Sequence, residues 1–420
     1  MKKLSVDLAV LGGGASGLTA AICAARKNKG KNIVILEAQE RVGKKILVTG
    51  NGRCNLLNEN ISLKNYNFDA HDFLKPLFKI YTKDRVLEFF HSLGLLIRVD
   101  TEGRVYPFSG QASAVLDVLR LECKNLNISE ICSFDIENIS LKGNKFIIKS
   151  NEFEIVSKNI IFSTGGAAFF NYKYFEKIYF FLNKLGHTYK DFFPALVPVR
   201  TNSVFESYLK GIRSKAKVKL LADNVLIKEE LGEIQFTDKG LSGICIFQIS
   251  RLISEFFSSK KINGKKYKKL SIDVDLLPNL ELNDIVMLLS NRVLNSKLES
   301  IENLFAGIIN KKFLIPILKA SGVPYKNRKL ESLLKDEIIK IAKTIKKFSF
   351  IPCGTMPFKN AQVMSGGVNL FEINNSTLES LKVENMYITG ELLNVDGDCG
   401  GYNLYWAWIS GMIAGNSVNL

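Results

Sequence analysis

The sequence predicts an α/β protein whose main domain is a doubly wound parallel sheet, and two observations predict this fold. Val6–Leu11 is an almost continuous apolar run, which is typical of a parallel strand buried on both faces. It leads through a glycine turn into a helix of small residues, Leu18–Arg26, and then into a second apolar strand, Asn32–Glu37. Strand, crossover helix and strand form the βαβ unit of such a sheet. A chain of 420 residues is too long for one compact core, so we expect two or three domains.

The turn after the first strand contains Gly12, Gly14 and Gly17 in G-x-G-x-x-G spacing. The first glycine permits the sharp turn, the second lets the backbone approach a pyrophosphate, and the third lets the helix lie close to the sheet. The helix then directs free N–H groups and the positive end of its dipole at the phosphates. We therefore expect these glycines, with Ala15 and Ser16 between them, to bind the diphosphate of a dinucleotide.

An acidic residue, Glu37, ends the second strand 20 residues after Gly17. A carboxylate at this place accepts a hydrogen bond from a ribose 2′-OH and disfavours a 2′-phosphate. Strand, turn, helix, strand and acid stand in the expected order, which makes the motif far more specific than three glycines alone. The motif does not distinguish NAD from FAD.

Two later segments favour FAD. Lys158–Ala168, KNIIFSTGGAA, reads as a strand that ends in a glycine turn and resembles the ATGG turn of flavoproteins built on this fold. Asn385–Gly415 reads as a strand, a Gly390–Glu391 turn, a loop with paired glycines and a buried apolar helix. In FAD enzymes of this architecture the start of that helix faces the pyrimidine edge of the flavin, where its dipole stabilises negative charge on the reduced ring.

The composition argues against a metalloprotein, a disulfide-bonded protein and a membrane protein. Seven scattered cysteines without a CxxC pair, and only three histidines, predict a reduced, cytoplasmic protein without a metal site. The Asn394–Cys399 loop is rich in Asp, Asn and Gly, but it lacks the ligand alternation and terminal glutamate of a calcium loop. No apolar stretch reaches the roughly 18 residues of a membrane helix, so we expect no membrane partner.

The net charge of +16 raises nucleic acid as a partner. The lysines are mostly dispersed, with short clusters at residues 260–261, 265–269 and 343–347, and no RNA-binding or DNA-binding motif accompanies them. We therefore expect a small-molecule substrate and regard nucleic acid as the weaker interpretation.

These motifs together resemble one family, the BaiN/RdsA-type flavoproteins, also described as aminoacetone-oxidase-like, FAD-binding NAD(P)/FAD-dependent oxidoreductases. The resemblance spans nearly the whole chain, and it rests on GGGASGLTAA, GKKILVTGNGRCNLLN, PALVPV, FTDKGLSG, AQVMSGGV and TGELLNVDGDCGGYNLYWAW. The second and the last of these motifs are highly specific.

The resemblance implies a Rossmann-like, doubly wound FAD-binding domain with an inserted small β-barrel domain and a further inserted helical domain. The expected boundaries are 1–190 and 359–420 for the FAD-binding domain, 191–278 and 348–358 for the β domain, and 279–347 for the helical domain. The sequence agrees, because Ser214–Thr237 alternates like antiparallel strands. From Asn283 to Lys347 apolar residues recur at helical spacing, with Asn283 expected as an N-cap.

The segment Val48–Asn55, VTGNGRCN, is implied to be a loop that contacts the flavin. Its glycines let the backbone approach the cofactor, and nearby cations offset pyrophosphate charge. Cys54 lacks the CxxxxC partner of a catalytic dithiol, so a packing role is favoured over a role as proton donor. The catalytic candidates are Cys54 and Tyr402. The expected cofactor-binding residues are Gly12, Gly14, Ala15, Ser16, Gly17, Glu37, Lys44, Lys45, Gly50, Asn51, Gly52, Arg53, Cys54, Asn55, Thr164, Gly165, Gly166, Gly390, Glu391, Gly400, Gly401, Tyr402 and Asn403.

The chain departs from the family pattern in three places. The segment after the TGG turn, AAFFNYKYFEKIYFF, lacks the usual glycine and serine residues; Ile244 replaces a proline after GLSG; and Met364 with Ser365 replaces a threonine before GGV. The first change lies where family members shape the flavin and substrate side, so the resemblance does not carry a substrate over to this chain.

The leading functional hypothesis is an FAD-dependent oxidoreductase that transfers hydride through flavin N5 to or from a small organic substrate, as an enone reductase or an amine oxidase. No second G-x-G-x-x-G occurs, so NADH or NADPH would bind only transiently as electron donor. The alternatives are a flavoprotein that acts on or binds RNA, and an FAD protein that senses redox state without turnover.

Overall fold

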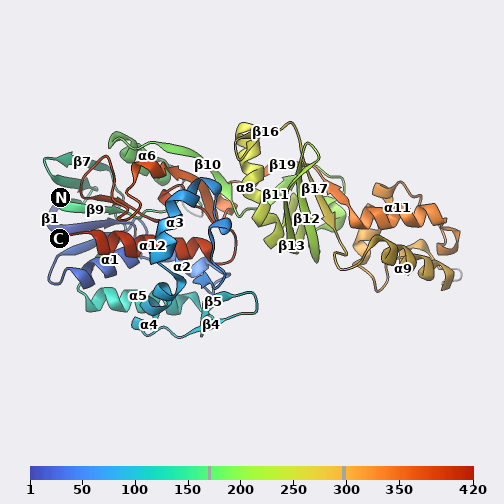
Figure 1. Ribbon diagram of the computed structural model, residues 1–420, viewed down its shortest axis with the longest axis horizontal. Helices are drawn as coiled ribbons and strands as arrows, with labels where there is room; N and C mark the ends of the chain where they lie inside the picture. The colour runs from blue at the N-terminus through green and yellow to red at the C-terminus, as the bar shows by residue number, and fades with distance from the viewer. Residues whose placement is uncertain (169–171, 296–298) are drawn as a thin grey trace. The chain divides into compact units, whose positions relative to one another are not determined.

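The structure is a computed structural model that describes residues 1–168, 172–295 and 299–420. Within them the chain forms two compact units (Figure 1). The first comprises Met1–Phe192 with Val363–Leu420, and the second comprises Phe193–Gln362. Part of the segment that departs from the family pattern, Phe169–Asn171, lies outside the described residues. The finer division into a β domain and a helical domain at 279–347 stays a prediction.

The first unit is built on a mixed sheet in the order β6-β2-β1-β9-β8-β7, with β21 also paired to β9. Its strands are β1 (Lys2–Leu11), β2 (Ile33–Leu36), β6 (Ser129–Ile131), β7 (Asn138–Lys142), β8 (Lys145–Lys149), β9 (Phe153–Phe162) and β21 (Met386–Ile388). The pairs among β6, β2, β1, β9 and β21 are parallel, and β7 and β8 add an antiparallel edge. Residues 8–11 of β1 and all of β2 are buried, as the apolar runs predicted. The Rossmann-like fold is confirmed.

The first unit also contains seven described helices. They are α1 (Ala15–Lys27), α2 (Lys44–Val48), α3 (His71–Ile80), α4 (Lys83–Ser92), α5 (Ala112–Asn125), α6 (Tyr172–Lys184) and α12 (Tyr402–Ser417). Shorter elements are β3 (Leu57–Asn58), β4 (Ile97–Val99), β5 (Arg104–Pro107), β20 (Val363–Val368) and the 3₁₀ turns η1 (Leu63–Asn65), η2 (Phe68–Ala70), η7 (Leu370–Glu372) and η8 (Gly390–Leu392). The strand β10 (Tyr189–Ala195) begins in the first unit and ends in the second.

The first and the last helix of the unit, α1 and α12, pack side by side (Figure 1). A Cβ atom at Gly411 would lie 2.4 Å from the carbonyl oxygen of Ser16, and one at Gly415 would lie 2.3 Å from that of Ala20. Only glycine allows so close an approach of two helix backbones. The C-terminal helix is buried and carries no charged residue, as the sequence predicted.

A buried polar network joins the segment before β10 to η7. The Nδ1 of His187 lies 3.1 Å from Glu372 Oε2, and its Nε2 lies 2.8 Å from the Ser380 hydroxyl. The same carboxylate accepts hydrogen bonds from the backbone and hydroxyl of Thr188. The Ser380 oxygen accepts the N–H groups of residues 382 and 383, so its own proton is donated to the imidazole. The arrangement therefore requires neutral His187, protonated on Nδ1.

Acid should weaken this network. Burial lowers the pKa of His187 and, with the nearby Lys382, outweighs the opposing effect of Glu372. Burial alone would raise the pKa of Glu372, but the hydrogen bonds from Thr188 and His187 outweigh it and lower that pKa. Both groups bind protons more readily in the unfolded chain, so stability falls as the pH drops below about 6.5. Urea unfolding of the wild type should show this loss between about pH 7 and about pH 5.

A variant pair tests the assignment. His187→Gln should cost about 1–3 kcal/mol at about pH 7 and should flatten the pH dependence. The control, His91→Gln, replaces an exposed histidine and should leave the slope unchanged. A slope that survives in His187→Gln would contradict the role of this network.

The second unit contains a seven-stranded antiparallel sheet in the order β18-β17-β12-β13-β14-β11-β19. Its strands are β11 (Val199–Thr201), β12 (Arg213–Ala222), β13 (Val225–Thr237), β14 (Gly240–Ser242), β17 (Leu270–Asp275), β18 (Phe348–Phe350) and β19 (Pro352–Thr355), and a separate hairpin is formed by β15 (Lys261–Ile262) and β16 (Lys265–Lys266). The pair β12–β13 bears out the alternation that predicted antiparallel strands.

The helices of the second unit share one apolar core with its sheet. They are α7 (Glu206–Leu209), α8 (Ile244–Ser259), α9 (Leu282–Asn295), α10 (Leu314–Ser321) and α11 (Lys335–Lys346), with 3₁₀ turns η3 (Ile301–Asn303), η4 (Lys311–Phe313), η5 (Leu330–Ser332) and η6 (Phe358–Asn360). The prediction that Asn283 caps α9 is wrong, because the helix begins at Leu282. Asp284 instead accepts a hydrogen bond from the N–H of Glu281 at this end. Among the described helices, none is both long and apolar enough to cross a membrane.

Candidate functional site

The glycine turn joins β1 to α1, and its three glycines have different surroundings. Gly12 has φ +97°, and a Cβ atom there would lie 2.5 Å from the carbonyl oxygen of Ser163. A Cβ atom on Gly17 would lie 1.9 Å from the carbonyl oxygen of Gly12. Gly14, in contrast, would direct its Cβ into open space, with no atom within 4 Å. The first and third glycines are therefore needed by the fold, whereas the open side of the second is available to a ligand.

Gly14 is also the N-cap of α1, and no side chain caps this end of the helix. The first N–H groups of α1 are thus available for phosphate oxygens. Ser16 is buried in the first turn of the helix, and a Cβ atom on Gly390 would lie 2.8 Å from its Oγ. Ala15 accepts the hydroxyl of Thr19 with its carbonyl. The structure thus brings Ala15, Ser16 and the Gly390 turn together.

Glu37 follows β2 and holds the glycine turn. Its Oε2 accepts the N–H of Gly13 at 2.8 Å, and its Oε1 accepts the N–H of Gln39 at 2.8 Å. Burial raises the pKa of Glu37, although these hydrogen bonds and the charge of Lys44 oppose the shift. Each oxygen keeps a lone pair that a ribose hydroxyl can use.

The VTGNGRCN segment follows α2 as a tight, irregular loop. Gly50, Asn51, Gly52 and Cys54 all have positive φ, at 56°, 55°, 80° and 56°. Such a run is unfavourable for residues other than glycine, and strained backbone of this kind clusters at ligand sites. The loop is anchored by the N–H of Ala112, which donates to the carbonyl of Gly52 at 2.8 Å.

The thiol of Cys54 is fully buried in this loop. Burial raises its pKa to about 12, so it is a neutral thiol at physiological pH. A buried, protonated thiol is a poor nucleophile and exchanges protons slowly with solvent. The geometry therefore favours the packing role over the catalytic role for Cys54.

The cations predicted near the diphosphate are already engaged by protein groups. Lys44 lies 3.0 Å from Glu40, which is mostly exposed, and 3.5 Å from the Gln39 side chain. Arg53 is exposed and lies over the ring of Tyr106 at 4.9 Å. Neither contact is strong in water, so both side chains keep the freedom to turn toward an anion.

The carboxylate of Glu391 joins three segments of the site. Its Oε2 lies 2.8 Å from Lys45 Nζ and accepts the N–H of Gly166 at 3.1 Å, while its Oε1 accepts the N–H of Met364 at 2.7 Å. A Cβ atom on Gly166 would lie 2.8 Å from the carboxyl carbon of Glu391. Glu391 thus fixes α2, the TGG turn and β20 against one another, which sequence reasoning did not anticipate.

The start of α12 lies against β3. Gly401 is the N-cap of α12 with φ +102°, no side chain caps this end, and a Cβ atom there would lie 2.6 Å from the backbone of Leu57. The carbonyl of Gly400 accepts the side-chain amide of Asn58 at 3.2 Å. The amide of Asn403 is bonded to the loop backbone, with two bonds of 2.8 Å to Gly397, so it shapes the loop.

Tyr402 is the first residue of α12 and is largely buried. Burial, together with the Asp398 carboxylate, raises the pKa of Tyr402, and the charge of Arg104 opposes the shift. Its phenol therefore carries its proton at physiological pH. Arg104 was not among the predicted site residues, and only its position in the folded chain relates it to Tyr402.

Other site residues were also missed. The hydroxyl of Tyr66 donates to the carbonyl of Tyr402 at 2.8 Å, and Ser365 donates to Asp396 at 2.7 Å. The AQVMSGGV motif was the only signal for Ser365, and no motif marked Tyr66.

Two buried oxygens at the site test whether FAD fits these residues. In the described part of the chain, three buried side-chain polar atoms have no hydrogen-bond partner, and two of them are Asn55 Oδ1 and Thr164 Oγ1. Unpaired buried polar atoms are costly, so each requires an explanation. Both belong to predicted FAD loops, and the hydroxyl and N–H groups of FAD are suitable donors. With the open side of Gly14 and two helix starts that no side chain caps, the residues fit FAD.

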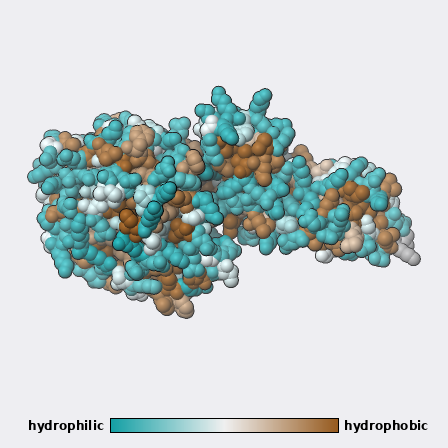
Figure 2. All heavy atoms as spheres, viewed as in Figure 1, coloured by the Kyte–Doolittle hydropathy of each residue, from teal (hydrophilic) through white to brown (hydrophobic). Residues whose placement is uncertain are grey.

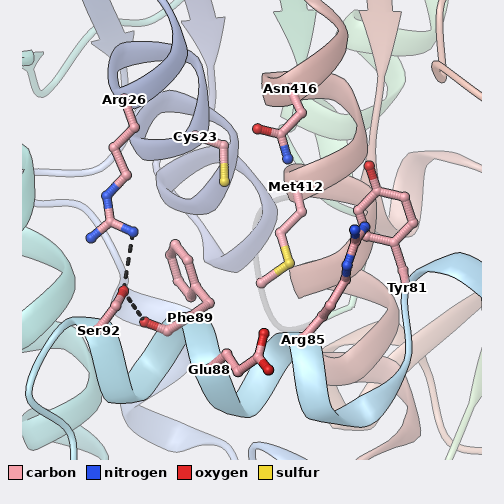
Figure 3. Close-up of a pocket in the computed structure, with 9 residues that line it drawn as sticks. All are labelled: Cys23, Arg26, Tyr81, Arg85, Glu88, Phe89, Ser92, Met412 and Asn416. Atoms are coloured by element: carbon pink, nitrogen blue, oxygen red, sulfur yellow. Dashed lines mark hydrogen bonds between the residues drawn. The ribbon is translucent and has the colours of Figure 1, made fainter.

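A cavity of about 340 Å³ lies elsewhere in the first unit (Figure 3). Its lining includes Phe89 of α4, and residues from the C-terminal parts of two other helices: Cys23 and Arg26 of α1, and Met412 and Asn416 of α12. None of the predicted site residues lines this cavity. It is therefore distinct from the glycine turn, which lies at the other end of α1.

Comparison with known proteins shows the family. Residues 6–417 match the model of the HI0933-like protein Rossmann domain. The chain belongs to this family. The HI0933-like chain is 34% identical over 411 residues to the 3-dehydro-bile acid delta(4,6)-reductase of Clostridium scindens, with 98% of each protein covered. It is 25% identical over 417 residues to the ribosomal RNA dihydrouridine synthase of Haemophilus influenzae, again with 98% of each covered.

A solved structure shares the fold. The FrdA chain of Escherichia coli quinol fumarate reductase superposes with a TM-score of 0.50 at 14% identity, covering 99% of this chain and 70% of that one. The predicted family and fold are thus confirmed, and the HI0933-like protein is an oxidoreductase of the FAD type.

Proposed function

We propose that this HI0933-like protein is an FAD-dependent reductase of carbon–carbon double bonds conjugated to a carbonyl group. The names of its relatives carry this proposal, because both denote reduction of such a bond. A 3-oxo-Δ4 steroid and the C5=C6 bond of uracil are both α,β-unsaturated carbonyl systems. The shared chemistry favours the reductase over the amine oxidase.

When bound, FAD would supply the hydride for reduction of the double bond, and the protein would have to provide a proton for the α-carbon of the substrate. In this proposal the α1 start and Gly14 bind the diphosphate, Glu37 binds the adenosine ribose, and the loops that contain Asn55 and Thr164 contact the rest of the cofactor. The remaining predicted cofactor-binding residues shape these loops.

Tyr402 is the better candidate for the proton donor. Its phenol is neutral and it stands at the start of α12, where the charge of Arg104 offsets part of the effect of burial and Asp398 on the phenolate left after transfer. Cys54 is completely buried, so it is the weaker candidate.

NADH or NADPH remains the proposed electron donor. The chain has one G-x-G-x-x-G motif, so a nicotinamide would bind transiently rather than in a dinucleotide domain of its own. Glu37 selects the adenosine end of FAD and does not bear on this choice.

Uridine in RNA is a second candidate substrate. The net charge of +16 favours it, because such a field attracts a polyanion more strongly than it attracts the single carboxylate of a bile acid. The two relatives named as ribosomal RNA dihydrouridine synthases, from Haemophilus influenzae and Escherichia coli, support it at 25% identity.

Anaerobic half-reactions test the proposal. The FAD-loaded protein should be bleached by NADH or NADPH, and a 3-oxo-Δ4 steroid or a uridine-rich RNA should restore the yellow colour. The reduced products should gain two hydrogens by mass spectrometry. Bleaching by an amine alone would support the oxidase, and reoxidation by oxygen alone would contradict the reductase and favour a redox sensor.

A further inference from the structure

The hairpin β15–β16 carries a dense positive charge. Residues 260–269 read KKINGKKYKK and contain six lysines and no acidic residue. All six lysines are exposed: Lys260, Lys261, Lys265, Lys266, Lys268 and Lys269. In Figure 2, hydrophilic side chains project where Figure 1 places β16.

These six lysines form a dense group in which no member has an ion pair with a described residue. Across the described residues, no carboxylate lies within 4 Å of any of the six ammonium groups. On β12, in contrast, Lys217 and Lys219 share Glu229 at 3.4 and 3.3 Å. The basic row of β12 is thus partly neutralised, whereas the hairpin is not.

The two nearest acidic residues hold the hairpin backbone. Asp223 accepts the N–H groups of Lys268 and Lys269 at 3.0–3.2 Å, and Glu255 accepts the N–H of Asn263 at 2.8 Å. Asn263 and Gly264 have φ of 48° and 80° and form a two-residue turn of the type that suits tight hairpins. The backbone is therefore fixed while the lysine side chains stay exposed, and the Lys260 ammonium lies over the rings of Phe256 and Phe257.

Part of this arrangement is unfavourable for the isolated protein. Lys261 lies directly opposite Lys266 in the two-stranded ladder. Like charges at directly opposed positions destabilise a sheet, and a hairpin of two-residue strands has little to offset the cost. The β7–β8 hairpin has the same opposed pair at Lys142 and Lys145, so the density of six lysines, and not this opposition alone, distinguishes β15–β16.

We propose that the hairpin Lys260–Lys269 binds the phosphate backbone of RNA. This inference rests on the second candidate substrate of the proposed function and gives that substrate a contact surface outside the FAD loops. Unpaired lysines on a fixed backbone release counterions from a polyanion without first breaking an ion pair. Two of the short lysine clusters noted in the sequence, at residues 260–261 and 265–269, thus lie together in this hairpin.

The chemistry of the tip favours RNA over a lipid surface. A membrane-binding hairpin would place apolar side chains at its tip for insertion. Here the tip is Asn263–Gly264, Ile262 is buried, and Tyr267 is half-buried. Phosphate contacts through lysine need no such insertion.

Salt-dependent binding tests the proposal. The FAD-loaded protein is titrated with a fluorescent uridine-rich single strand of about 20 nucleotides over a range of salt concentrations. The Lys265→Gln, Lys266→Gln, Lys268→Gln, Lys269→Gln variant should lower the slope of log K against log salt by about 3. Its affinity near physiological salt should fall roughly ten- to a hundredfold. The side chains are exposed, so an unchanged thermal midpoint should show that the fold is intact.

A matched variant of another hairpin, binding to lipid vesicles and an activity assay serve as controls. Lys142→Gln with Lys145→Gln removes two exposed lysines from the β7–β8 hairpin and should change the slope by less than the corresponding Lys265→Gln, Lys266→Gln pair. Equal slopes in these two variants would overturn the proposal, as would stronger binding to phosphatidylserine vesicles than to RNA. Steroid reduction is measured on the same samples. Its absence beside lysine-dependent RNA binding would overturn the steroid proposal alone.

Discussion

Gly17→Ala is expected to destabilise the first unit by about 3 kcal/mol or more. Its Cβ atom would lie 1.9 Å from the carbonyl oxygen of Gly12. The oxygen is a backbone atom and the Cβ is bonded directly to the backbone of α1, so neither can move aside without displacing the helix. Urea unfolding should show a lower midpoint, and FAD binding should be lost with the fold.

Gly14→Ala is the matched control three residues earlier. Its φ of −82° suits alanine, and the added methyl group meets no atom within 4 Å. The variant should therefore lose only about 1 kcal/mol of stability, which is the cost of alanine in place of glycine at an N-cap. If the diphosphate approaches this residue as proposed, the Kd for FAD should rise about tenfold or more. Unchanged FAD affinity in Gly14→Ala would place the diphosphate elsewhere.

Tyr402→Phe is expected to lower kcat for double-bond reduction about a hundredfold while FAD binding is retained. The substitution removes the hydroxyl proton and keeps the ring that packs against the loop. Stopped-flow measurements should show that flavin reduction by the nicotinamide is nearly unchanged and that the substrate half-reaction is slow. A loss confined to the nicotinamide half-reaction would contradict proton donation by Tyr402.

Cys54→Ser separates the two catalytic candidates. The thiol is buried with a pKa of about 12, so its replacement should change kcat by less than about threefold. A small loss of stability is expected, because a hydroxyl would replace the thiol in a buried site. A hundredfold fall in kcat in this variant would restore Cys54 as the proton donor.

Much of the fold of the first unit follows from local patterns. The apolar run of β1, the spacing of Gly12, Gly14 and Gly17, and the acid after β2 each reflect one short-range constraint, and all were recognised in the sequence. The buried helix α12 was equally clear, because it lacks charge along its whole length. Short-range constraints can be recognised in the sequence because each one restricts the residue types that are allowed at a few neighbouring positions.

Contacts between distant segments were not predictable in the same way. Glu391 contacts Lys45, which lies 346 positions earlier in the chain, and neither sequence motif indicates that the two residues are in contact. Arg104 near Tyr402 and the network around His187 are of the same kind. The prediction of the α9 N-cap was wrong for a local reason. Asn283 and Asp284 are both residue types that favour a helix start, so residue type alone does not fix the residue at which the helix begins.

The packing of α12 on α1 has a consequence for biosynthesis. The ribosome completes the whole second unit before it makes Gly411 and Gly415, the residues that close on Ser16 and Ala20. Until then the nascent chain exposes the apolar side of its earliest helix and has only half of a cofactor cradle. The growing polypeptide must therefore be shielded from aggregation for most of its translation, and FAD can be captured only near release.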